Sequence, residues 1–139
     1  MSTGLEWLID AEGCKSDPLC NIDTLRALCD EIIARLELRV VGSPVWHQFP
    51  DPAEDQGPGG ATGMYLLSES HLTIHTFPEF QAATLNLYCC RPTRHWNWET
   101  ALAERLGATR VSVRSVVRGP SRLLSACGAA SGAVERADR

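Results

Sequence analysis

Apolar positions in two parts of the chain recur at helical spacing. Between Leu25 and Leu36 they return every three or four residues, as on one face of an amphipathic helix. Asn21 or Asp23 stands just before this stretch and can cap its first turn. A similar stretch begins at Trp98 and is followed by glycine, a residue that commonly ends helices. The helices predicted from this spacing cover residues 21–36 and 98–106.

Shorter apolar or alternating stretches, several rich in β-branched residues, predict strands instead. A segment with three prolines and three glycines, residues 49–60, is expected to be a loop. Few helices among many adjacent strands favour an α+β fold, a two-layer sandwich of a mainly antiparallel sheet with two helices on one face. The strands expected are 5–11, 38–41, 63–67, 71–77, 83–90 and 109–117.

The 139 residues suggest one domain, expected over 1–118, and the Ser-, Ala-, Gly- and Arg-rich residues 119–139 are expected to be a disordered tail. A net charge of -4 argues against a nucleic-acid partner. No apolar run reaches the roughly 20 residues that span a bilayer, so no membrane association is expected. The first residues lack signal-peptide features, which favours a cytoplasmic protein whose six cysteines are reduced.

Residues 67–79 concentrate the candidate chemistry: a Glu69–Ser70 bond, then His71 and His75. Histidines four apart can share a metal ion on a helix, but on a strand they lie about 13 Å apart. The β-branched residues between them favour a strand, so no metal site is expected. Ser70 also lacks the GxSxG motif of serine hydrolases. Taken alone, these residues favour ordinary polar strand histidines over a catalytic pair.

A longer pattern changes this interpretation. Residues 60–63, Gly-Ala-Thr-Gly, and residues 67–79 resemble the short bacterial and archaeal S-adenosylmethionine decarboxylases, whose pattern is close to GxSG, four apolar residues and SESHxxIHTxPE. Residues 83–90 resemble the strand of that family that carries the catalytic cysteine. The chain departs from the pattern at Thr62, where serine is usual, and at Arg91, where glycine is usual.

The resemblance implies a self-processing precursor. The chain would cut itself between Glu69 and Ser70, and Ser70 would become a pyruvoyl cofactor that forms a Schiff base with the amine of the substrate. The implied roles in processing are a hydroxyl from Thr62 and a base from His75, with His71 structural or supportive. The implied reaction turns S-adenosylmethionine into decarboxylated S-adenosylmethionine for spermidine synthesis.

Three further residues take roles from the resemblance. Cys90 matches the proton donor, whereas its neighbour Cys89 would point to the opposite face of a strand. Glu79 matches a position that binds the ribose hydroxyls of the substrate. Phe49 could stack on the adenine, although Trp46 competes for that role and either ring could simply pack in the core.

The resemblance also implies a homodimer or a higher oligomer of cleaved protomers, with sites at the interface. One alternative keeps the pyruvoyl chemistry but takes arginine or ornithine as substrate. Another is an unprocessed, non-catalytic regulatory paralogue, and a third is a domain that merely shares the strand pattern. Intact mass distinguishes the processed from the unprocessed alternatives.

Overall fold

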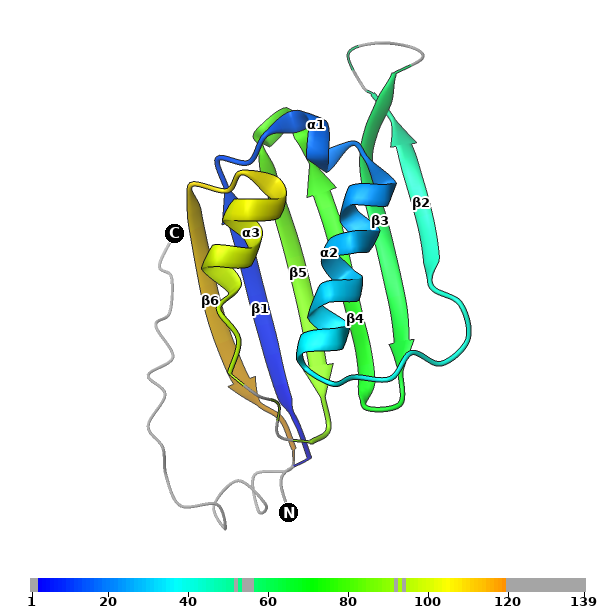
Figure 1. The fold of residues 1–139 in the computed structure, drawn as a ribbon, viewed down its shortest axis with the longest axis vertical. Coiled ribbons are helices and arrows are strands. Elements are labelled where there is room, and N and C mark those ends of the chain that lie inside the picture. Colours follow the sequence, from blue (N-terminus) through cyan, green and yellow to red (C-terminus); the bar gives the residue numbers. More distant parts are fainter. Residues whose placement is uncertain (1–2, 52, 54–56, 92, 94, 120–139) are drawn as a thin grey trace.

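The computed structural model describes residues 3–51, 53, 57–91, 93 and 95–119, and folds them into one sheet with helices on one face (Figure 1). The six strands stand in the order β2-β3-β4-β5-β1-β6, and every neighbouring pair is antiparallel. This confirms the α+β two-layer prediction. The strands are β1 (Leu5–Glu12), β2 (Val45–Pro50), β3 (Pro58–Leu67), β4 (Ser70–Phe77), β5 (Ala82–Cys89) and β6 (Arg110–Val117).

Both predicted helices are present. In α2 (Ile22–Arg35) the side chain of Asn21 accepts a hydrogen bond from the Thr24 N–H, which satisfies one amide of the first turn. In α3 (Trp98–Leu106) the helix ends at Gly107, whose φ of 70° suits a residue without a Cβ. Two short elements were not predicted, because three or four residues show no periodicity: α1 (Ser16–Leu19) and the 3₁₀ turn η1 (Pro78–Phe80).

The core lies between the helices and the sheet. Side chains on the helix-facing side of the strands are buried, whereas their neighbours in sequence point to the other side. Thr76 is a buried polar residue of this core; its hydroxyl accepts from the Ala61 N–H at 2.9 Å and donates to the Leu19 carbonyl at 2.7 Å. The Thr76 hydroxyl therefore has both an acceptor and a donor bond, so it ties the end of α1 to β3 and β4 with little penalty for its burial.

Two predictions about the region before β3 were wrong. Residues 38–41 form no full strand, and only Val40 makes an isolated bridge, to Leu67. Residues 45–50 form β2 instead, and the predicted loop 49–60 is strand at both ends. Prolines signalled a loop, but β2 lies at the edge of the sheet and pairs on one side alone, where proline is tolerated.

The face of the sheet opposite the helices remains open to solvent. It exposes several large apolar side chains that alternate with the buried ones: Val45, Phe49, Met64, Leu66 and Val116. We call this surface the open face. The predicted disordered tail lies outside the described residues, except for residue 119. Within the described part of the chain, no helix has the length and apolar character needed to cross a membrane.

Candidate functional site

The Glu69–Ser70 bond lies in a tight hairpin turn. Leu67 on β3 pairs with Ser70 on β4, so that only Ser68 and Glu69 connect the two strands. Ser70 adopts a φ of 151°, in a region that residues other than glycine rarely occupy. Such a conformation persists only where its surroundings enforce it, and here Ser70 also pairs with Cys89 of β5. The turn therefore holds a strained backbone at the predicted cleavage site.

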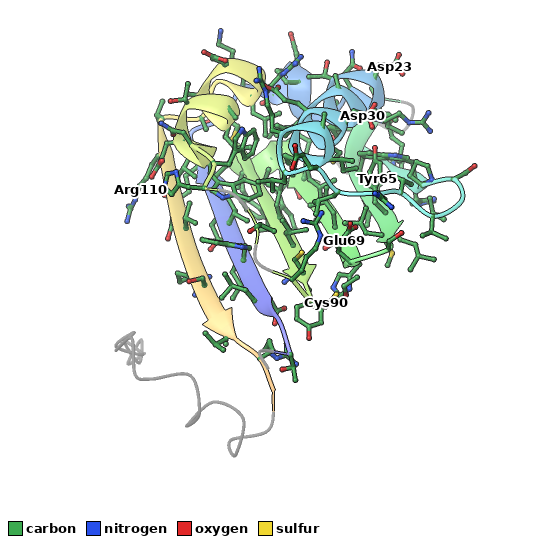
Figure 2. The ribbon with its side chains drawn as sticks, turned by 60° about the horizontal axis from the view of Figure 1, so that its bottom comes forward. Asp23, Asp30, Tyr65, Glu69, Cys90 and Arg110 are labelled. Carbon is green, nitrogen blue, oxygen red and sulfur yellow. The ribbon has the colours of Figure 1, made fainter. Side chains whose placement is uncertain are left out.

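The carbonyl at this bond has a fixed hydrogen-bond donor. The backbone N–H of Cys90 donates to the Glu69 carbonyl oxygen at 2.9 Å. Figure 2 shows Glu69 and Cys90 close together, at the end of the sheet where β5 stops. A donor aimed at a carbonyl oxygen stabilises the negative charge that develops there when the carbon is attacked. The geometry thus supplies one half of an oxyanion site.

The Glu69 side chain is buried, with 8% of its surface exposed, and is held on both oxygens. Its Oε2 accepts from the Arg39 N–H and its Oε1 from Arg91 Nη2, each at 3.1 Å. Burial raises the pKa of the Glu69 carboxyl, but the Arg39 N–H and the Arg91 guanidinium outweigh burial, and the resulting pKa lies below its usual value. Glu69 is therefore an anchored carboxylate.

His71 contacts the serine directly. Its Nδ1 lies 3.0 Å from Ser70 Oγ, and its ring packs against Tyr88 with centroids 5.9 Å apart. A ring nitrogen at this distance can orient the hydroxyl or share its proton. The supportive role predicted for His71 thus has a geometric basis.

The adjacent cysteines differ as strand alternation predicts. Cys89 is fully buried among the core side chains, and burial raises the pKa of its thiol. Cys90 follows the end of β5 and is exposed. Of the two thiols, Cys90 is therefore the one that can meet a bound molecule. Together with Glu69, Ser70, His71 and Arg91 it forms what we call the Ser70 end.

A second group of predicted residues lies at the other end of β4. Thr62 pairs with His75 across β3 and β4, and Thr62 Oγ1 lies 2.5 Å from His75 Nδ1. A hydroxyl and an imidazole at hydrogen-bond distance form a pair that can pass a proton. The hydroxyl and base predicted from the sequence are thus in contact.

Aromatic rings surround this pair on the open face. The His75 ring lies 4.4 Å from the Phe77 ring and 5.7 Å from the Phe49 ring, measured between centroids. Trp46 instead points toward the helices, where its ring packs edge-on against Tyr65. Glu79 is exposed on η1, directly after Pro78. We call this group the His75 end: Phe49, Thr62, His75, Phe77 and Glu79.

The two ends do not meet within one chain. Ser70 begins β4 and His75 lies five residues further along the same strand. At about 3.3 Å per residue, the separation along the strand is about 16 Å. The structure thus brings Thr62 to His75, and Glu69 to Cys90, but leaves the predicted base far from the predicted cleavage bond of the same protomer.

Three features of the Ser70 end were not predicted from the sequence: the Cys90 N–H, the Arg39 N–H and the Arg91 side chain. The first two are backbone groups, which every residue except proline carries, so no sequence signal marks them. Arg91 was visible as a departure from the family pattern, but its partner Glu69 lies 22 residues away and the pairing depends on the fold.

Known proteins resemble this chain over most of its length. The sequence model of the S-adenosylmethionine decarboxylase family matches residues 5–119. An S-adenosylmethionine decarboxylase proenzyme of Archaeoglobus fulgidus is 32% identical over 93 residues, which are 67% of this chain and 76% of that protein. One of Aquifex aeolicus is 31% identical over 117 residues, 84% of this chain and 81% of that protein.

A crystal structure of the adenosylmethionine decarboxylase from Aquifex aeolicus has the same fold. It superposes with a TM-score of 0.65 at 28% identity, over 86% of this chain and 92% of the other. The family match covers every residue of both the Ser70 end and the His75 end. The chain belongs to the S-adenosylmethionine decarboxylase family.

Proposed function

We propose that this protein cuts itself between Glu69 and Ser70, converts Ser70 into a pyruvoyl group and decarboxylates S-adenosylmethionine. The observation that carries the proposal is the strained Ser70, whose preceding carbonyl already accepts a hydrogen bond from the Cys90 N–H. The related proteins of Archaeoglobus fulgidus and Aquifex aeolicus are named as proenzymes of this decarboxylase, which supports both the processing and the substrate.

Cleavage begins at the Ser70 hydroxyl. Its oxygen bonds to the Glu69 carbonyl carbon and gives up its proton, while the Cys90 N–H stabilises the oxyanion. The Ser70 nitrogen then leaves with a proton, so that an ester replaces the amide. His71, 3.0 Å from the hydroxyl, orients it for this attack. Conversion of the amide also relieves the unfavourable φ of Ser70.

Elimination completes the cut. A base removes the Cα proton of Ser70, the Cβ–Oγ bond breaks, and the electron pair leaves with the Glu69 carboxylate. The dehydroalanine that remains takes up water, loses ammonia and becomes the pyruvoyl group at the start of the second fragment. His75, hydrogen-bonded to Thr62, is the proposed base of the processing reaction.

The residues around Ser70 fit the chemistry of the mature group. A pyruvoyl ketone supplies an electron sink that accepts the electrons released as CO2 leaves. Cys90 is exposed beside this position and can deliver a proton to the substrate carbon. Cys89 cannot, because it is buried in the core.

Substrate contacts are proposed at the His75 end. Phe49 lies on the open face with 41% of its surface exposed, so its ring can stack on an adenine. Glu79 is exposed on η1 and its carboxylate can accept hydrogen bonds from both hydroxyls of a ribose. Trp46, the competing ring, packs toward the helices, which supports Phe49.

A second copy of the chain would unite the two ends. Because Ser70 and His75 lie about 16 Å apart along one strand, we propose a homodimer in which the open faces meet and run in opposite directions. The Ser70 end of one protomer would then lie against the His75 end of the other. The apolar side chains exposed on the open face support this packing, since a two-fold interface buries the same patch on both copies.

Intact mass spectrometry of the purified protein tests the proposal. We expect two fragments, 1–69 and 70–139, the second beginning with a ketone that reacts with a hydrazine reagent. The cleaved protein should release CO2 from S-adenosylmethionine and not from arginine or ornithine. Ser70→Ala is the control that should stay in one piece. A wild-type chain that remains intact and unreactive would refute the proposal.

A further inference from the structure

Arg91 is the residue at the Ser70 end to which the family pattern assigns no role. Its Nη2 donates to Glu69 Oε1 at 3.1 Å and to the Glu37 carbonyl oxygen at 2.6 Å. Glu37 lies just after the last turn of α2, so Arg91 links the hairpin turn to the end of that helix. The residues that follow α2 hold the hairpin turn at a second point, where the Ser68 N–H donates to the Arg39 carbonyl oxygen at 2.8 Å.

This arrangement fixes the residue on the acyl side of the predicted cleavage bond. Both oxygens of the Glu69 carboxylate are bound, one by Arg91 and one by the Arg39 N–H. The Glu69 carbonyl oxygen is bound by the N–H of Cys90, the residue next to Arg91 in sequence. The side chain and the carbonyl group of Glu69 are thus both held. This limits rotation of the Glu69–Ser70 peptide group, whose carbonyl carbon the Ser70 hydroxyl must attack.

The charge at Glu69 also changes during cleavage. Before the cut it carries one carboxylate; when the Cβ–Oγ bond of Ser70 breaks, the electron pair remains on Glu69 as a second, terminal carboxylate. Like charges at such short range repel, and Glu69 is largely buried from water. Among the described residues, the cation in contact with Glu69 is Arg91.

We infer that Arg91 positions the Glu69–Ser70 bond for self-cleavage and stabilises the carboxylate that leaves with Glu69. The inference rests on the proposed self-processing and adds a residue to it. Arg91 exchanges no proton, since an arginine side chain stays charged. Its guanidinium has several N–H donors, so it can serve the old carboxylate and the new one together.

The alternative is an ordinary ion pair that stabilises the fold. The chain offers a matched control in Arg105, which pairs with Glu31 at 2.9 Å and has a side chain 42% exposed, against 44% for Arg91. Arg105 lies on α3 and its partner on α2, so neither belongs to the hairpin turn. Replacing either arginine by methionine removes one positive charge and one ion pair with a glutamate, at similar distance.

The test follows the cleavage of freshly synthesised chains over time on denaturing gels. We expect Arg91→Met to cleave at least about tenfold more slowly than wild type, Arg91→Lys to recover part of the rate, and Arg105→Met to match wild type. In a Glu69→Gln chain, the Arg91→Met substitution should have a much smaller effect, because the carboxylate it serves in the precursor is gone. Melting curves of uncleavable Ser70→Ala chains, with and without Arg91→Met, report any loss of folding separately.

The possible outcomes separate the two proposals. If wild type never cleaves, the proposed function fails. If wild type and Arg91→Met cleave at equal rates, Arg91 has no part in cleavage although the self-processing stands. If Arg91→Met slows cleavage by the same factor with and without Glu69→Gln, Arg91 does not position the bond through the Glu69 side chain, and that part of the inference is wrong. If cleavage of Arg91→Met matches wild type once each is measured equally far below the melting temperature of its uncleavable Ser70→Ala form, the role is structural and the whole inference is wrong.

Discussion

The backbone N–H of Cys90 donates a 2.9 Å hydrogen bond to the carbonyl oxygen of Glu69. One residue therefore carries two separable functions in our proposal: its amide polarises the carbonyl during cleavage, and its thiol supplies a proton to the substrate afterwards. The amide belongs to the backbone and survives most substitutions, whereas the thiol does not. The two functions can be separated by mutation.

Cys90→Ala should leave self-cleavage nearly unchanged and lower the rate of decarboxylation by about a hundredfold or more, within the range typical of a lost general acid. The alanine keeps the N–H that binds the Glu69 carbonyl but has no proton to give. Fragment mass reports the first property and CO2 release the second. Full decarboxylation by Cys90→Ala would show that another group protonates the substrate.

Mixed dimers should reveal cleavage between protomers. A His75→Ala chain keeps Ser70 but lacks the base, and a Ser70→Ala chain keeps the base but cannot be cut. Alone, each should remain intact. Together, the His75→Ala chain should be cut, because in a mixed dimer its Ser70 faces the intact His75 of the other chain. Mass tags on the two chains identify which one is cleaved. Absence of any product in the mixture would contradict the shared site.

The open face should respond strongly to charge. Met64→Glu places a carboxylate on a side chain that is 54% exposed in the single chain and, in our proposal, buried between protomers. We expect the dimer to weaken by several kcal/mol, since burial of an unpaired charge is costly, and processing to slow with it. Sedimentation velocity measures the association. Arg105→Glu, a charge change on α3 away from the open face, serves as the control and should leave the dimer intact.

Acidification should destabilise the folded protein, because it protonates the Glu69 carboxylate. The folded protein holds its pKa below the usual value, so the ionised form stabilises the fold at and above the usual Glu pKa of about 4.3. This contribution is lost as the pH falls through the folded-state pKa. In the uncleavable Ser70→Ala chain the melting temperature should therefore drop on acidification more steeply than in Ser70→Ala with Glu69→Gln. Equal slopes would mean that Glu69 is not anchored as described.

The two adjacent thiols should differ in reactivity. Cys90 is exposed, whereas Cys89 is buried and burial raises the pKa of its thiol. Iodoacetamide should alkylate Cys90 at least about tenfold faster in the native protein, and both at similar rates in denaturant. Peptide mass mapping after short exposure distinguishes them. Comparable labelling of the two in the native state would indicate that β5 ends elsewhere.

Local signals in the sequence predicted much of the fold. The helix 98–106 was predicted with its observed bounds, because its apolar spacing and Gly107 agree. The strand at 45–50 was missed because prolines flank it and only its edge position makes Pro50 acceptable. A strand was predicted at 38–41 from apolar composition, but no neighbouring strand pairs with it beyond a single bridge.

The candidate site was predictable only in part. The family resemblance pointed to Ser70, His75 and Thr62, and to Cys90 over Cys89; in the structure Thr62 contacts His75, and Cys90 is exposed whereas Cys89 is buried. Contacts between distant segments could not be read from local patterns. The pairing of Arg91 with Glu69 depends on how β5 lies beside the β3–β4 hairpin, and the separation of the two ends depends on β4 being one continuous strand.

The length of β4 has a consequence for when the protein becomes active. If the partner's His75 must reach across to Ser70, a newly made chain cannot mature until it encounters another. Dilute chains would accumulate as uncleaved precursors, and the rate at which active enzyme forms would rise with the square of their concentration. A cell could thus set the moment at which decarboxylation begins through the rate of synthesis alone, without a separate activating enzyme.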